Sequence, residues 1–404
     1  MKNTNNQFRT ELLAPAGDIE KAYIALDYGA DAIFLGAKAY SLRAHASNFD
    51  IEDIRKVIEY AHSKNKKVYL VTNILCHNAL LKAAPDFMKK LVECNPDGFI
   101  TADPYLINLL NKNYPEKEVH VSTQQSICNS KAALFWKRNK ATRVVLAREV
   151  DYNELSQLMH NLNNQIEVEI FIHGAVCISY SGRCMMSNNF SLRDANVGGC
   201  AQSCRWKYTV ENDDIKNKSK FFTMSAKDMV EITNIEELLK LNIASFKIEG
   251  RMKSIHYVAT VVNAYRKAMD RYYNNEDLEI ANLKLELKKA ANRDADTAWM
   301  DGNPGYDKML YHDEEKKLTQ NYVFVVQRKT EDGYYEVITK NHIKKTDLLD
   351  IIGPNHNNVE TKILEMKNKD KQDIEVCPTP MSTLYLKLDT NIELNYPDIA
   401  RIKM

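Results

Sequence analysis

The sequence predicts an α/β fold, a TIM-like (β/α)8 barrel with a cysteine-rich insertion, followed by a small C-terminal antiparallel β domain. Eight short apolar runs, mostly separated by helix-length segments, lie in the first two-thirds of the chain, and eight is the strand count of such a barrel. Polar residues follow these runs, at positions that a barrel gathers on one rim. Beyond residue 318, short strand-like runs with turn residues replace the helical periodicity.

The elements follow one another in a regular order. Asp18 stands where a helix N-cap is expected, Ile19 and Ala22 begin the helical apolar spacing, and Gly29 ends that helix. The runs predicted as barrel strands are 11–14, 32–35, 67–71, 98–101, 119–122, 143–147, 166–172 and 245–248. A doubly wound open sheet has the same local pattern, and a ninth run, 221–224, could replace one of the eight.

The chain of 404 residues is long enough for two domains. We expect residues 1–273 to form the barrel, with the cysteine cluster at 177–204, and residues 274–317 to form a charged linker or helical segment. Residues 318–404 are expected to form a small β-barrel-like domain, which is within the usual domain size range. Its predicted strands are 322–327, 334–339, 348–352, 359–364 and 383–388.

Composition and charge exclude several classes of protein. Lys and Arg number 55 against 54 Asp and Glu, so the formal net charge of +1 excludes a partner held by bulk charge. Hydrophobic residues make up 44% and charged residues 27% of the chain, which excludes wholesale disorder. Residues 1–10 are polar, and no apolar run has the length of a membrane span. We therefore expect a cytoplasmic protein with no membrane partner.

Eight cysteines are unevenly distributed, and four of them, Cys177, Cys184, Cys200 and Cys204, lie within 28 positions. In a reducing compartment such a cluster indicates a metal site before a disulfide framework. Four thiolates suit tetrahedral zinc or a 4Fe-4S cluster, and the six-residue gap between the first two fits structural zinc poorly. Spacing alone does not decide between zinc and a 4Fe-4S cluster. Two other interpretations also remain open: four free thiols, or a nucleophilic Cys177 with His173 as its base.

Several segments of the chain closely resemble the peptidase U32 (collagenase-like) family. The strongest likeness begins at Glu169 and runs through Cys177 and Cys184 to Ser187. The segments that carry the resemblance are 12–17, 28–32, 122–124, 144–149, 169–187, 193–208 and 246–254. They follow the family's order. Relatives carry a glycine-aromatic turn where this chain has residues 292–299, which retain Arg293 and Thr297 but lose that turn.

The resemblance implies a barrel that binds an iron-sulfur centre through Cys177, Cys184, Cys200 and Cys204. Chain length and the C-terminal β domain resemble the branch that 5-hydroxylates the wobble uridine of tRNA using prephenate. The resemblance therefore implies an RNA-modifying hydroxylase with a 4Fe-4S cluster, prephenate as co-substrate and tRNA as partner. Four further cysteines, which are scattered along the chain, need no function.

Two other functions compete with hydroxylation. The family name implies a collagenase-like peptidase, yet the sequence has neither a His-Glu-x-x-His zinc motif nor a Gly-x-Ser-x-Gly nucleophile motif. Hydroxylation of a pyrimidine carbon requires a redox cofactor, which the cysteine quartet could supply. The third possibility is a non-catalytic RNA-binding protein stabilised by zinc or a cluster.

Candidate site residues follow the predicted strands. A small dicarboxylate co-substrate requires cations, and arginine binds a carboxylate through paired hydrogen bonds. The predicted substrate-binding residues are Arg43, Asn73, Gln124, Arg148, Lys247 and Arg251. Glu149, His173 and Glu249 are the predicted catalytic residues, because carboxylates and imidazole transfer protons. His173 lies four positions before Cys177, so it could instead support the cluster through a hydrogen bond.

RNA binding would use local cationic runs and exposed aromatic rings, since bulk charge is absent. The cationic runs are 64–67, 137–140, 216–220 and 344–345. Trp206, Tyr208 and Trp299 are candidate stacking platforms for unpaired bases. We expect the cationic runs to surround one rim of the barrel.

Overall fold

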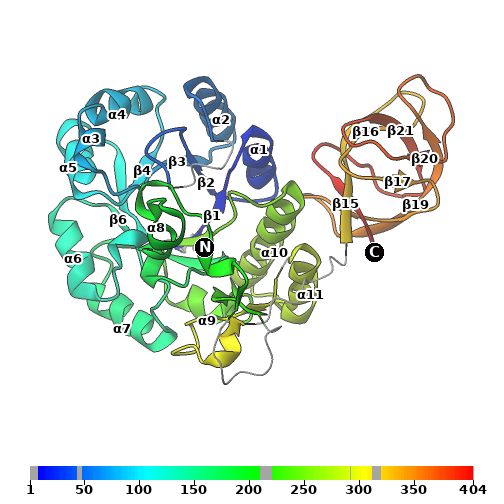
Figure 1. Ribbon diagram of the computed structural model, residues 1–404. Coiled ribbons are helices and arrows are strands. Elements are labelled where there is room, and N and C mark those ends of the chain that lie inside the picture. The colour runs from blue at the N-terminus through cyan, green and yellow to red at the C-terminus, as the bar shows by residue number, and fades with distance from the viewer. Residues whose placement is uncertain (1–7, 43–47, 210–220, 292, 312–319, 404) are drawn as a thin grey trace, which may run out of the picture.

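The computed structural model describes residues 8–42, 48–209, 221–291, 293–311 and 320–403. It contains two barrels, which lie side by side in Figure 1. The larger is the parallel barrel of the first part of the chain. The smaller is the antiparallel barrel that ends it.

The larger barrel has eight parallel strands and is closed. Its sheet runs in the order β12-β1-β2-β3-β4-β5-β6-β7, and β12 also pairs with β7. This closure confirms the predicted barrel and excludes the doubly wound open sheet. The strands are β1 (Glu11–Pro15), β2 (Ala32–Gly36), β3 (Lys67–Thr72), β4 (Gly98–Thr101), β5 (Glu118–Val121), β6 (Arg143–Val145), β7 (Glu167–Gly174) and β12 (Ser245–Ile248).

Helices surround the barrel, as Figure 1 shows. Asp18, Asp50, Asp103 and Asp151 each cap a helix by accepting a hydrogen bond from a backbone N–H of its first turn. Apolar residues of these helices pack on the outer face of the sheet and form the main core. The helices are α1 (Ile19–Asp27), α2 (Ile51–Ser63), α3 (Asn78–Leu81), α4 (Ala84–Val92), α5 (Pro104–Asn113), α6 (Ser130–Arg138), α7 (Tyr152–Leu162), α9 (Ile235–Lys240) and α10 (Ile255–Asn274).

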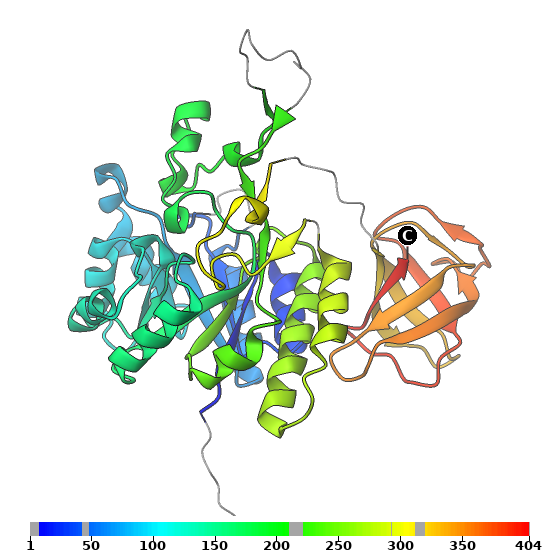
Figure 2. The same cartoon turned by 90° about the horizontal axis from the view of Figure 1, so that it is seen from below.

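The cysteine-rich insertion lies between β7 and α9 and projects from one end of the barrel (Figure 2). It contains α8 (Met186–Ser191) and a small hairpin of β8 (Tyr208–Thr209) and β9 (Phe221–Phe222). The ninth predicted run, 221–224, therefore begins in this hairpin and does not replace a barrel strand. Strand β11 (Asp228–Val230) pairs antiparallel with β7 at the edge of the barrel.

The segment 274–317 carries elements that join the larger barrel. Helix α11 (Ile280–Ala290) packs beside α10, and β13 (Ala295–Asp296) extends the sheet by pairing with β11. The short strand β14 (Met309–Leu310) pairs with β10 (Ser225–Ala226) of the insertion. The segment thereby contacts the insertion through this strand pair.

The C-terminal domain is a closed antiparallel barrel of six strands. Five were predicted, and the sixth, β22, follows them at the end of the chain. Closure leaves the sheet without an exposed edge. In barrel order the strands are β15 (Gln320–Lys329), β16 (Tyr335–Thr339), β21 (Thr383–Leu388), β19 (Val359–Lys367), β18 (Leu348–Ile352) and β22 (Ile399–Lys403). A separate ribbon joins β17 (Ile343–Lys344) to β20 (Val376–Cys377).

The two barrels share an interface that is partly apolar and partly charged. Val325, Ile352 and Ile399 of the smaller barrel belong to the main core of the larger one. The Tyr28 hydroxyl of α1 donates to the carbonyl of Ile352 at 2.9 Å. Arg401 is fully buried and pairs with Glu286 of α11 and with Asp350 of β18.

Among the described residues, no helix combines the length and the apolar composition needed to cross a membrane.

Candidate active site at the barrel rim

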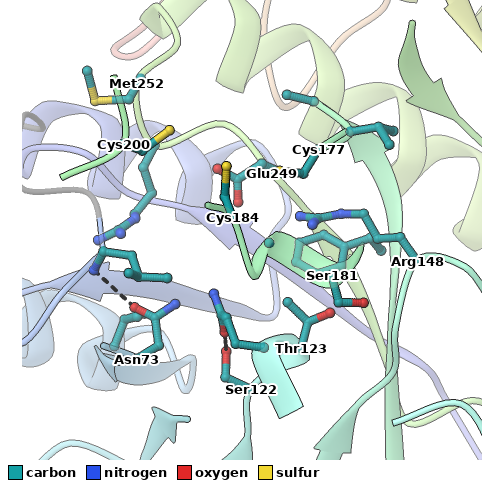
Figure 3. A pocket seen from close by; sticks show the side chains of 18 of the residues that line it. Asn73, Ser122, Thr123, Arg148, Cys177, Ser181, Cys184, Cys200, Glu249 and Met252 are labelled. Atoms are coloured by element: carbon teal, nitrogen blue, oxygen red, sulfur yellow. Dashed lines mark hydrogen bonds between the residues drawn. The ribbon is translucent and has the colours of Figure 1, made fainter. Parts of the chain in front are cut away.

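A cavity of about 230 Å³ opens at the carboxyl ends of the barrel strands, under the insertion (Figure 3). Its floor is apolar and consists of one side chain each from β2, β3, β4, β6 and β7, namely Phe34, Val71, Ile100, Val145 and Phe171. Active sites of TIM barrels lie at this end of the fold. The cavity is therefore the candidate active site.

All four cysteines of the insertion line this cavity. Cys184 is buried, the other three are half-buried, and none forms a disulfide. Burial raises the pKa of Cys204, and Cys177, Cys200 and Cys184 raise it further, so these three thiols lie within electrostatic range of Cys204. Figure 3 shows Cys177, Cys184 and Cys200 around the cavity. In the described part of the chain, no three His, Cys, Asp or Glu side chains are grouped to hold a single metal ion.

The loop between Cys177 and Cys184 is fixed to the barrel by Glu149. Its carboxylate accepts hydrogen bonds from the Ser181 backbone N–H at 2.6 Å and from the Ser181 hydroxyl at 2.5 Å. Ser181 has a left-handed φ of 47°, a conformation that needs support from its surroundings. Arg183 also donates to the backbone carbonyl of Gln124. Glu149, predicted as catalytic, thus contacts the cysteine loop and is not among the residues that line the cavity.

Most of the predicted substrate-binding residues line the cavity. Those that do are Asn73, Gln124, Arg148, Lys247 and Arg251, and Arg43 lies outside the described residues. The Arg148 guanidinium lies 3.8 Å from the centroid of the Phe171 ring. Both terminal nitrogens of Arg251 donate to the Ser41 hydroxyl at 3.0 Å. These contacts hold two guanidinium groups at the cavity, where they can attract a carboxylate.

Glu249 also lines the cavity, directly after β12. The backbone of Gly174 approaches it closely, because a Cβ atom at Gly174 would lie 2.4 Å from the Glu249 carbonyl oxygen. Gly174 also has a φ of 113°, which favours glycine. The end of β7 therefore needs glycine here in order to pack against the Glu249 backbone.

His173 lies apart from the cysteine cavity and lines a second cavity of about 320 Å³. It faces α10, where its Nδ1 lies 3.3 Å from the Tyr265 hydroxyl and its ring contacts Tyr257 edge-on. Burial, with a smaller effect from Lys253, lowers the pKa of His173 to about 3. The ring is therefore neutral near pH 7.

Two of the predicted cationic runs that the structure describes lie away from the rim. Residues 64–67 lead into the amino end of β3, and 137–140 precede that of β6, so both lie at the end of the barrel opposite the cavity. Lys64 pairs with Asp27 at 2.6 Å, and Lys67 pairs with Glu118 at 2.9 Å. Run 344–345 belongs to the smaller barrel, and run 216–220 lies outside the described residues. For runs 64–67 and 137–140 the expectation of a position at the rim is wrong, because helices return the chain to the far end of the barrel.

Arg205 and Lys253 line the cavity and were not predicted from the sequence. The Lys253 amine lies 3.5 Å from Asp228, which also pairs with Arg293 at 3.6 Å. Lys253 lies within segment 246–254, which resembles the family, and this resemblance was the sequence signal that could have identified it as a site residue.

The insertion presents exposed aromatic rings beside the cavity. Trp206 is 40% exposed and Phe190 is 54% exposed. Tyr208 packs between Phe190 and Phe222, with ring centroids 5.6 Å and 5.8 Å away. Trp299 is partly buried against the residues around Phe171. Of the three predicted stacking platforms, Trp206 is exposed, whereas Tyr208 and Trp299 are partly buried.

Fold and cavity define a TIM-barrel protein with a cysteine-lined site at the catalytic end and an appended antiparallel barrel. The chain belongs to peptidase family U32. The model of peptidase family U32 matches residues 17–310, and that of its C-terminal domain matches residues 319–401.

Three curated relatives carry different names. The chain is 42% identical to tRNA hydroxylation protein P1 of Bacillus subtilis, over 95% of this chain and 93% of the relative. It is 34% identical to 23S rRNA 5-hydroxycytidine C2501 synthase of Escherichia coli, over 66% of this chain and 40% of the relative. It is 33% identical to a collagenase of Porphyromonas gingivalis, over 65% of this chain and 66% of the relative.

Proposed function

We propose that the protein is an RNA-modifying hydroxylase that 5-hydroxylates the wobble uridine of tRNA with prephenate as co-substrate and a 4Fe-4S cluster as cofactor. One observation carries the proposal: the four cysteines of the insertion line a single cavity together with Arg148, Glu249 and Arg251. The names of relatives that act on tRNA and on ribosomal RNA support RNA hydroxylation.

The arrangement of the cysteines fits a cluster better than a single zinc ion. One zinc ion needs its ligands to converge on one point, and the described residues offer no such group of three. In a 4Fe-4S cluster each thiolate binds a different iron, so thiols around the wall of one cavity suit it. Cys177, Cys184, Cys200 and Cys204 would hold the cluster. When bound, it would supply the redox chemistry that side chains lack.

The remaining cavity residues would bind and orient the co-substrate. Arg148 and Arg251 would attract the carboxylates of prephenate, and their contacts to Phe171 and Ser41 would limit their movement. Glu249 would accept or donate a proton, since its carboxylate belongs to the cavity wall. The apolar floor would exclude water from the reacting atoms.

Exposed rings of the insertion would contact the RNA. Loops of RNA are recognised through unstacked bases that lie on aromatic side chains, and Trp206 and Phe190 are exposed beside the cavity. Arg183, Arg193, Arg205 and Lys207 belong to the same insertion, where they would contact phosphates.

The proposal is tested by complementation. A strain that lacks 5-hydroxyuridine in its tRNA receives the gene for this chain or its Cys184→Ala variant, and nucleoside mass spectrometry measures the modified base. We expect restoration by the wild type and none by the variant. Absence of 5-hydroxyuridine with stably produced wild-type protein would overturn the proposal.

The relative named collagenase favours peptidase activity as a second candidate. Incubation of the purified protein with collagen peptides, with and without an iron chelator, tests it. Cleavage that the chelator leaves unchanged would favour the peptidase, and intact peptides would favour the hydroxylase.

A further inference from the structure

Lys247 occupies an unusual position in the cysteine cavity. It lies on β12, in register with Phe171 on β7 and with Leu13 on β1. Its amine lies 4.5 Å from the ring centroid of Phe34 and 5.5 Å from that of Phe171. The side chain is only 5% exposed. A lysine amine is thus held among the apolar floor residues of the cavity.

The partner of Lys247 is a carboxylate inside the barrel. Its Nζ lies 2.6 Å from Oε1 of Glu169, which is fully buried. Arg143 approaches the other oxygen of Glu169 at 3.3 Å and also pairs with Glu11 at 2.7 Å. Glu169 therefore has a second cation, so its negative charge does not depend on Lys247 alone.

The surroundings of Lys247 lower the pKa of its amine. Burial lowers the pKa of the amine, and the attraction of Glu169 does not offset this effect. Burial alone would raise the pKa of Glu169, but Lys247 and Arg143 outweigh it. Lysines that are desolvated in apolar pockets act as nucleophiles toward carbonyl carbons.

We propose that Lys247 forms a Schiff base with a small 2-oxo carboxylate. Lys247 first loses a proton to solvent in the cavity, and the neutral amine attacks the ketone carbon. A C–N bond forms, the C=O π bond breaks, and a proton moves from nitrogen to oxygen to give a carbinolamine. A proton from solvent then reaches the hydroxyl, which leaves as water. The product is an iminium ion on Lys247 beside ionised Glu169, so atoms and charge balance.

The cavity selects for a carboxylate next to the carbonyl. Arg148, Arg251 and Lys253 line it with Lys247, and cations of this kind bind carboxylates. Its volume of about 230 Å³ lies below the range of drug-sized pockets, which favours a small ligand. This reaction needs neither RNA nor iron, so it is independent of the proposed hydroxylation.

Reductive trapping tests the inference. The full chain is incubated with pyruvate and cyanoborohydride, and peptide mapping by mass spectrometry locates each adduct. A lower pKa leaves a larger fraction of an amine neutral near pH 7. We therefore expect Lys247 to be labelled faster than the exposed Lys284, which provides an internal control. Acetone, which lacks a carboxylate, should label Lys247 more slowly than pyruvate does.

The Lys247→Met variant should lose the fast adduct, and Lys284→Met should retain it. Because peptide mapping also locates the adduct in the wild type, the result does not depend on folding of the Lys247 variant. An unlabelled Lys247, labelling no faster than at Lys284, or equal labelling by acetone and pyruvate would overturn the inference. Any of these results would leave the test of tRNA hydroxylation unaffected.

Discussion

Replacement of Arg401 by methionine should destabilise the interface between the two barrels. Arg401 is fully buried. Its guanidinium pairs with Glu286 and, at 2.9 Å, with Asp350. Methionine keeps much of the side-chain volume but removes the charge, so two carboxylates lose a cation at the centre of the interface.

The loss of stability depends on which cations remain beside the two carboxylates. Removal of one partner of a buried ion pair costs about 3 to 5 kcal/mol. Lys289 still contacts Glu286 at 3.0 Å and Asp350 at 2.9 Å, so both acids keep a neighbouring cation. We therefore expect a loss near the lower limit, about 3 kcal/mol, which is roughly a hundredfold in the unfolding equilibrium.

Urea unfolding followed by circular dichroism measures this loss. Arg328→Met is the matched control, because Arg328 is 71% exposed and pairs with Glu336 on the surface of the smaller barrel. Exposed pairs contribute less than about 1 kcal/mol. Equal losses in the two variants would refute the reasoning that the Arg401 contacts stabilise the interface.

Three further predictions concern the site, the core and the proposed contact with RNA. Cys184→Ala should lose bound iron and its visible absorbance after anaerobic reconstitution, whereas Cys94→Ala should keep both. Burial raises the pKa of Glu231 from its usual 4.5 to about 8. Folding stability should therefore fall by up to about 1.4 kcal/mol per pH unit between pH 5 and 8, and Glu231→Gln should flatten this slope in urea titrations. Trp206→Ala should weaken tRNA binding in filter assays by about 1 to 3 kcal/mol, and Phe135→Ala should not.

Each of these predictions has a contradicting result. Full iron content in Cys184→Ala would remove that thiol from the ligand set. For Glu231, protons bound in the folded state at pH 6 are released on unfolding, so an increase in stability with pH would contradict its raised pKa. Equal losses of tRNA affinity in the Trp206 and Phe135 variants would show that the exposed ring of Trp206 has no specific contact with RNA.

The strands of the larger barrel could be predicted because parallel strands covered on both faces are continuous apolar runs. The missed strand, β22, has a different pattern. Its central residue, Arg401, is charged yet fully buried. Its partners Asp350 and Glu286 are 51 and 115 positions away in the sequence. Because these partners are so distant in the sequence, the sequence alone indicates that Arg401 is exposed.

The position of His173 could not be predicted from the alternation of side chains between the two faces of a strand. Phe171 lines the cavity, so a regular strand would direct His173 into it as well. However, Lys247 pairs with Phe171 and the next residue, Ile248, pairs with His173, so β7 has one extra residue at this point. Such a bulge reverses the face on which the following side chain lies. His173 therefore faces α10.

The end of the barrel at which runs 64–67 and 137–140 lie could have been predicted. Residues 64–67 directly precede a predicted strand, and residues before a strand lie at the amino end of a parallel barrel. The cavity lies at the carboxyl end. By contrast, the convergence of Cys184 and Cys200 depends on the fold of the insertion, whose short turns show no periodicity.

Iron and sulfide analysis of the anaerobically reconstituted protein tests the proposed function most directly, with the quadruple variant of Cys177, Cys184, Cys200 and Cys204 as control. We expect about four irons and four sulfides per wild-type chain and neither in the variant, with the barrel still folded by circular dichroism. One zinc ion per chain, or iron that the variant retains, would contradict the assignment of these four cysteines to an iron-sulfur centre.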